Sequence, residues 1–150
     1  MDCDGVLTDG RLYFSARGEE MKVFDVRDGQ GIVSWHRAGY KSGIISGRGA
    51  AEIIQRRADE LGIDFVRVES TDKIRHFEEI ISALEIPAEN VAYIGDDIGD
   101  IGLMGRVGFA VAVADAVPEA KAAAHYVTKA TGGRGAVREV VDKLLAGDAK

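Results

Sequence analysis

The sequence predicts a three-layer α/β fold in which a doubly wound parallel sheet lies between two layers of helices. Two observations indicate this fold. Short apolar runs rich in β-branched residues alternate with longer segments in which apolar residues recur every three or four positions. Each longer segment has the length of a crossover helix, and strands joined by such helices lie parallel. A chain of 150 residues, 46% of them hydrophobic, can bury one core, so we expect a single domain over residues 1–150.

The first expected element is a β-hairpin over residues 11–26, directly after the acidic opening MDCDGVLTDG. Its strands are RLYFS and EMKVFDV, and ARGE with its glycine supplies the turn. Further strands are expected at residues 41–46, 64–68, 91–95, 109–113 and 125–128. Helices are expected at residues 29–39, 50–62, 71–86, 101–108, 118–124 and 135–147. This alternation leaves no room for a linker or a second domain.

Composition narrows the classes of partner. The formal net charge of −6 argues against a nucleic acid or an anionic membrane as the main partner, because both require clustered Lys and Arg. A single cysteine, Cys3, excludes an intramolecular disulfide. No apolar run approaches the roughly 20 residues of a membrane-spanning helix, and the acidic start does not resemble a signal peptide. We therefore expect a cytoplasmic protein that contacts neither nucleic acid nor membrane.

Polar residues gather where the expected strands end, which is where a parallel sheet binds its ligands. They are Asp2 and Asp4, Ser46, Lys73, and Asp96, Asp97 and Asp100. Several carboxylates in so small a volume repel one another unless a cation lies among them. Magnesium prefers such hard oxygen ligands and keeps waters that a phosphate oxygen can displace. The sequence therefore predicts a Mg²⁺ site beside a phosphate site.

The same residues suggest a reaction. Lys73 supplies a compact positive charge for phosphate oxygens, and Ser46 supplies a hydroxyl donor. A carboxylate that faces a phosphoryl group can attack phosphorus and form an aspartyl-phosphate. A second acid two residues further along can protonate the leaving oxygen and later activate water.

In order, the motifs D-x-D-G-V-x-T, S-G, K and G-D-D-x-x-D resemble those of the haloacid dehalogenase superfamily, whose domain is Rossmann-like, and the resemblance spans nearly the whole chain. The segments VRDGQGI, AYIGDDIGD, VAVADAVPEA and GGRGAVREV are further similar to the 3-deoxy-D-manno-octulosonate 8-phosphate phosphatases of lipopolysaccharide biosynthesis.

The resemblance implies a role for each site residue. Asp2 would be the nucleophile and Asp4 the general acid/base, and Mg²⁺ would be held by Asp2, the Asp4 backbone carbonyl and Asp96. Ser46, Gly47 and Lys73 would bind phosphate, and Asp97 and Asp100 would orient Lys73 or metal-bound water. Arg48 resembles an arginine that suits the carboxylate of an acidic sugar phosphate.

The resemblance also implies an architecture. The gaps between the motifs hold no cap domain, and capless relatives form homotetramers through their hairpins. The apolar hairpin residues are more than a lone hairpin can bury. Arg134, in a glycine-rich segment, is a candidate anion contact. Relatives carry about five apolar strand residues before the nucleophile, but only Met1 precedes Asp2, so we expect the sheet to lack its central strand.

Other functions stay open at this point. They are a phosphatase for a nine-carbon acidic sugar such as sialic acid 9-phosphate, another phosphatase or phosphotransferase of the superfamily, a non-catalytic oligomerisation domain related to sugar cytidylyltransferases, and a response-regulator receiver. The receiver is disfavoured because its acidic pair and phosphorylated aspartate come in a different order. Arg27 or Asp28 could touch substrate, although turn positions are the plainer interpretation.

Overall fold

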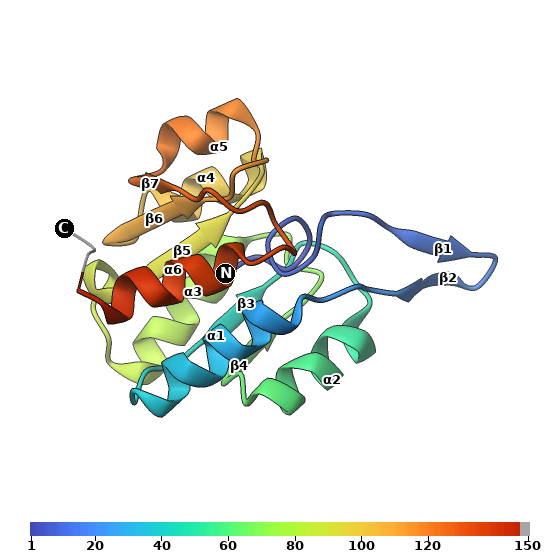
Figure 1. Cartoon of the computed structure of the whole chain (residues 1–150), viewed down its shortest axis with the longest axis horizontal. Coiled ribbons are helices and arrows are strands. Elements are labelled where there is room, and N and C mark those ends of the chain that lie inside the picture. The colour runs from blue at the N-terminus through green and yellow to red at the C-terminus, as the bar shows by residue number, and fades with distance from the viewer. Residues whose placement is uncertain (148–150) are drawn as a thin grey trace.

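The computed structural model describes residues 1–147, and its strands and helices alternate along the chain (Figure 1). The strands are β1 (Tyr13–Ser15), β2 (Gly18–Met21), β3 (Gly43–Ile45), β4 (Phe65–Arg67), β5 (Ala92–Gly95), β6 (Phe109–Ala112) and β7 (Tyr126–Val127). The helices are α1 (Val26–Arg37), α2 (Ala51–Leu61), α3 (Lys73–Leu84), the 3₁₀ turn η1 (Ala88–Asn90), α4 (Ile98–Met104), α5 (Pro118–Ala123) and α6 (Ala136–Leu145).

The strands form parallel ladders apart from the hairpin. β3 pairs with β4, and β6 lies between β5 and β7, all in parallel register. β1 and β2 form an antiparallel hairpin that extends away from the rest of the chain (Figure 1). An α/β fold with parallel strands and an early hairpin is thus confirmed.

Several helices and strands begin or end at other residues than expected, and two of the helix starts are set by side-chain caps. α1 begins at Val26 because Asp25 accepts a hydrogen bond from the Arg27 N–H, so the expected start at residue 29 was too late. α4 begins at Ile98 rather than residue 101, because Asp97 caps it in the same way. The hairpin is also shorter than residues 11–26, since its first strand begins at Tyr13 and its second strand ends at Met21.

The first two residues lie between the two halves of the parallel structure. The Met1 α-amino group donates to the Gly43 carbonyl, the Ile45 N–H donates to the Met1 carbonyl, and the Asp2 N–H donates to the Ile94 carbonyl, each at 3.0 Å. Behind Met1, an apolar cavity of about 230 Å³ separates β3 from β5. Its walls include side chains of α1, α3 and α6. Met1 and Asp2 therefore bridge β3 and β5 only at the end where the site lies.

Helices α1 and α6 pack side by side (Figure 1). Asp28, buried in α1, accepts hydrogen bonds from the N–H groups of Gly135 and Arg138 and so caps the start of α6. The core is built from aliphatic residues of the strands and of the helix faces that cover them. Within residues 1–147, no helix combines the length and apolar character needed to cross a bilayer.

Candidate active site

The loop after Asp2 turns tightly on itself. The N–H groups of Leu7 and Thr8 both donate to the Cys3 carbonyl, at 2.9 and 3.1 Å. Gly5 has a φ of +85°, and a Cβ there would lie 2.0 Å from Oδ2 of Asp96. Glycine is thus required both by the left-handed backbone and by the approach of Asp96. Cys3 is fully buried, and burial raises the pKa of its thiol to about 12, so this thiol is a protonated, packed side chain.

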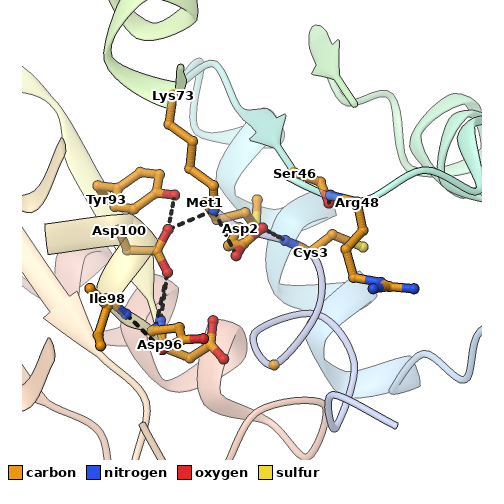
Figure 2. Close-up of polar contacts among 12 residues, drawn as sticks. Met1, Asp2, Cys3, Ser46, Arg48, Lys73, Tyr93, Asp96, Ile98 and Asp100 are labelled. Carbon is orange, nitrogen blue, oxygen red and sulfur yellow. Dashed lines mark hydrogen bonds and ion pairs between the residues drawn. The ribbon is translucent and has the colours of Figure 1, made fainter. Parts of the chain in front are cut away.

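Lys73 joins two of the carboxylates. Its ammonium group lies 2.8 Å from Oδ2 of Asp2 and 2.7 Å from Oδ1 of Asp100 (Figure 2). Burial lowers the pKa of Lys73, but the two carboxylates outweigh it and hold that pKa above its usual value. Burial likewise raises the pKa of Asp2, against the attraction of Lys73.

Asp100 is engaged at both oxygens. Oδ1 accepts from Lys73 and, at 2.6 Å, from the Tyr93 hydroxyl, while Oδ2 accepts from the N–H groups of Asp96 and Asp97. Burial alone would raise its pKa, but Lys73 and these hydrogen bonds hold the pKa of Asp100 below its usual value. A carboxylate so fully engaged is an anchor for Lys73 rather than a free metal ligand.

Asp96 is the opposite case. Its Oδ1 is buried and accepts no hydrogen bond from residues 1–147. Burial, with the nearby charges of Asp2 and Asp100, raises the pKa of Asp96 to about 7. Oxygens of Asp2, Asp96 and Asp100 lie within 4.8 Å of one another. An unpaired buried oxygen in a cluster of carboxylates is the setting in which a divalent cation binds.

Asp4 contacts the hairpin rather than the other acids. Its Oδ1 accepts a hydrogen bond from Nζ of Lys22, and its Oδ2 is buried without a partner in the described chain. Lys22 also donates to Glu19 at 2.7 Å. Asp4 therefore lies at the border between the strand ends and the hairpin.

Ser46 and Arg48 follow β3 on the other side of Asp2 from Asp100 (Figure 2). The Ser46 hydroxyl accepts the Arg48 N–H at 3.3 Å, and the exposed Gly47 lies between them. The Arg48 guanidinium is 45% exposed and lies 3.5 Å from Glu19. The backbone places these residues at the strand end that carries Asp2, with Arg48 reaching outward.

Other residues lie elsewhere than expected or were missed. The exposed Asp97 caps α4 and makes no contact with Lys73 among the contacts of residues 1–147. Asp28 is a cap for α6, and Arg27 pairs with Asp25 and with the Arg134 carbonyl. Lys22 and Tyr93 had no signal in the sequence, because a lone lysine or tyrosine in a strand pattern is usually a surface or core residue.

The glycine-rich segment packs on the opening loop. Gly133 donates to the Val6 carbonyl at 2.9 Å, and Gly132 donates to Asp115. A Cβ on Gly132 would lie 1.8 Å from the Gly5 carbonyl oxygen. This segment therefore supports the loop that carries Asp4.

Comparisons with known proteins show the family of this chain. Residues 63–140 match the family of haloacid dehalogenase-like hydrolases. A 3-deoxy-D-manno-octulosonate 8-phosphate phosphatase KdsC from Yersinia pestis is 46% identical over 96% of this chain and 76% of the relative. The enzyme of the same name from Escherichia coli K12 is 45% identical over the whole chain and 79% of the relative.

Solved structures give the same result. The Y. pestis phosphatase superposes with a TM-score of 0.93 at 47% identity, covering 99% of this chain and 80% of the other. A Moraxella catarrhalis phosphatase in complex with magnesium, phosphate and KDO has a TM-score of 0.92 at 37% identity, covering 97% and 83%. Sequence and fold thus agree, and the chain belongs to the haloacid dehalogenase-like hydrolases, in the family of 3-deoxy-D-manno-octulosonate 8-phosphate phosphatases.

Proposed function

We propose that this protein is a Mg²⁺-dependent phosphatase that hydrolyses 3-deoxy-D-manno-octulosonate 8-phosphate to the free sugar acid and phosphate, a step in making lipopolysaccharide precursors. The observation that carries the proposal is the position of Lys73 between Asp2 and Asp100, beside the unpaired oxygen of Asp96. Relatives about 45% identical over the whole chain carry this enzyme's name.

Asp2 acts as nucleophile in this proposal. One of its carboxylate oxygens attacks phosphorus, the bond from phosphorus to the sugar oxygen breaks, and that oxygen takes a proton from Asp4. The resulting aspartyl-phosphate is then hydrolysed by water, whose proton returns to Asp4. Lys73 neutralises charge on the phosphoryl oxygens throughout, from the place where it is held by Asp100.

The residues at the site fit a magnesium ion. Asp96 has a buried oxygen without a partner, and Asp2 lies within reach of the same point. Asp2, the Asp4 backbone carbonyl and Asp96 would hold the ion, with Asp100 orienting Lys73. When bound, magnesium offsets the mutual repulsion of the acids and of the phosphate.

The substrate's two ends would meet different residues. Ser46 and the Gly47 backbone, with Lys73, suit the phosphate, and the exposed Arg48 suits the sugar carboxylate. Arg134, also exposed, is a further candidate for that carboxylate. Arg48 also resembles the arginine that octulosonate phosphatases carry directly after S-G, where enzymes for nine-carbon sugars tend to carry glutamate, so it favours the eight-carbon sugar.

The proposal includes a capless, cytoplasmic homotetramer. The hairpin exposes apolar side chains, with Phe14 65%, Val23 50% and Leu12 43% accessible, and a second copy of the chain could cover them. We further propose one continuous doubly wound sheet. A strand in the cavity between β3 and β5 would join the β3–β4 pair to the β5–β6–β7 sheet.

The test is phosphate release from 3-deoxy-D-manno-octulosonate 8-phosphate and from its nine-carbon analogue, with Mg²⁺ and with chelator. We expect Mg²⁺-dependent release that favours the eight-carbon sugar, and no turnover by Asp2→Asn, whose amide cannot attack. Asp142→Asn, which removes an exposed carboxylate paired with Arg138, is the matched control and should retain full activity. Preference for the nine-carbon sugar would reassign the substrate, and turnover by Asp2→Asn would exclude the covalent route.

A further inference from the structure

Lys22 is a buried lysine at the base of the hairpin. Its side chain has no solvent exposure, although it follows the exposed Met21 at the end of β2. Nζ contacts Oδ1 of Asp4 and lies 2.7 Å from Oε1 of Glu19. The hairpin, which extends away from the body in Figure 1, thus places a charged group inside the molecule at its base.

Burying an ammonium group is costly unless anions compensate it. Burial lowers the pKa of Lys22, but hydrogen bonds to Asp4 and Glu19 outweigh burial and raise that pKa, so the group stays charged. Glu19 is itself only 7% exposed, and its second oxygen lies 3.5 Å from Arg48. The charges therefore alternate in a row, Asp4, Lys22, Glu19 and Arg48.

The contact differentiates the two oxygens of Asp4. Oδ1 is occupied by Lys22, while Oδ2 is buried without a partner in the described chain. We propose that Lys22, braced by Glu19, is a positioning residue that fixes the Asp4 carboxylate so that Oδ2 is the oxygen that exchanges the proton with the sugar. This role rests on the proposed function, in which Asp4 protonates the leaving group.

A purely structural role for Lys22, as an anchor of the hairpin, predicts different kinetics. An anchor would affect all substrates alike, because its loss disturbs the whole site. A residue that positions a general acid matters for an alcohol leaving group, which needs a proton, and matters little for p-nitrophenolate, which leaves without one. The ratio of the two activities therefore separates the roles.

The experiment compares kcat/KM for 3-deoxy-D-manno-octulosonate 8-phosphate and for p-nitrophenyl phosphate, since kcat/KM reports the steps up to departure of the leaving group. For Lys22→Met we expect a loss of roughly 10- to 100-fold on the sugar phosphate and less than about 3-fold on the aryl phosphate. Lys41→Met, which removes an exposed lysine paired with Asp64, should change neither.

A double-variant cycle adds a second readout. If Lys22 acts through Asp4, then Lys22→Met should cost nothing further in an Asp4→Asn background. Equal losses on both esters, or fully additive losses in the cycle, would overturn the positioning role. If Lys22→Met does not fold, Lys22→Arg must show the same selective loss at smaller size, and an unchanged ratio would overturn the proposal.

The activity of the wild-type chain distinguishes failure of the proposed function from failure of the positioning role of Lys22. Turnover of p-nitrophenyl phosphate but not of the sugar phosphate would refute the proposed substrate, and the same comparison would then use glycerol 3-phosphate as the alkyl ester. Turnover of no ester would overturn both proposals.

Discussion

Nζ of Lys73 lies 2.8 Å from Oδ2 of Asp2, so the lysine at the start of α3 holds the acid at the start of the chain. The same nitrogen is bound to Asp100, which Tyr93 and two backbone N–H groups keep in place. Asp2 is therefore oriented from two directions: Oδ1 accepts the Cys3 N–H of its own loop at 2.7 Å, and Oδ2 is held from outside that loop by residues of α3, β5 and α4.

Lys73→Met should lower phosphate release by about 100-fold or more, because in the proposed mechanism it removes the cation that neutralises the phosphoryl oxygens. Binding of inorganic phosphate, measured as product inhibition, should weaken as well. Lys41→Met is the control for loss of a surface charge. Phosphate inhibition equal to that of the wild-type chain would contradict the assignment of Lys73 to the phosphate.

Asp96→Asn should stabilise the metal-free protein at neutral pH. The pKa of Asp96 is about 7 in the fold and near 3.8 when unfolded, so the folded state binds the extra proton between these values. Stability from this group is present below about pH 4 and is lost as pH rises to 7. Melting in EDTA should therefore show Asp96→Asn matching the wild type at pH 4 and exceeding it by roughly 3 °C or more at pH 8.

Adding Mg²⁺ should reverse that order. The wild-type chain gains stability by binding the ion, whereas Asp96→Asn has lost a ligand and should gain little. An equal increase in Tm for both proteins at pH 8 would exclude Asp96 from the metal site.

Gly132→Ala should destabilise the fold and impair turnover. A Cβ at this position would lie 1.8 Å from the backbone oxygen of Gly5, so either the glycine-rich segment or the loop carrying Asp4 must move. We expect a loss of about 2 to 4 kcal/mol, seen as a Tm lower by roughly 5 to 10 °C. Gly99→Ala, whose Cβ would meet nothing within 4 Å, is the matched control. If activity and Tm are unchanged in Gly132→Ala, the backbone can make room for a Cβ at this position and the fold does not require glycine there.

Extending the chain before Met1 by four apolar, β-branched residues should stabilise it. Such residues would lie between β3 and β5 in the cavity of about 230 Å³. The N–H and C=O groups of Ala92 and Ile94 in β5 point away from β6, so a strand in the cavity could bond to them. They would also replace the buried Met1 α-amino group, whose pKa burial lowers to about 6, with a neutral amide. Filling a cavity of this size is worth at most about 5 kcal/mol.

The control for that extension is four Gly and Ser residues, which cannot fill an apolar cavity. The apolar extension should raise the Tm by roughly 5 °C or more over this control. Equal melting of the two extended chains would refute a strand in the cavity.

Phe14→Glu should dissociate the proposed tetramer. Phe14 is 65% exposed at the hairpin, and a charge there would oppose burial against a second copy. Light scattering after size exclusion should give a smaller particle for Phe14→Glu than for the wild-type chain. Leu145→Glu, at an exposed position at the end of α6, should not change the mass. A monomeric wild-type chain would refute the assembly outright.

The positions of strands and the grouping of polar residues at strand ends could be predicted from the sequence, because both depend on local pattern. Apolar runs located β5 and β6, and the rule that ligands bind beyond strand ends brought Lys73, Asp96 and Asp100 into one predicted site. Contacts between distant segments could not be predicted. Lys22 turns inward only because the chain after β2 returns to the site, and Asp28 caps a helix more than a hundred positions away. Helix starts shifted because caps at Asp25 and Asp97 decide them.

The hydrogen bond from Gly133 to Val6 also determines when the site can form during synthesis. A ribosome makes Asp2 and its loop more than a hundred residues before it makes the segment that packs on that loop. Contacts between such distant parts of a chain form late, because the long intervening segment must close first. A nascent chain stalled before residue 131 therefore holds Asp2 and Asp4 in a loop that lacks the contacts from Gly132 and Gly133, and we expect phosphatase activity only after residues 131–135 have packed on that loop.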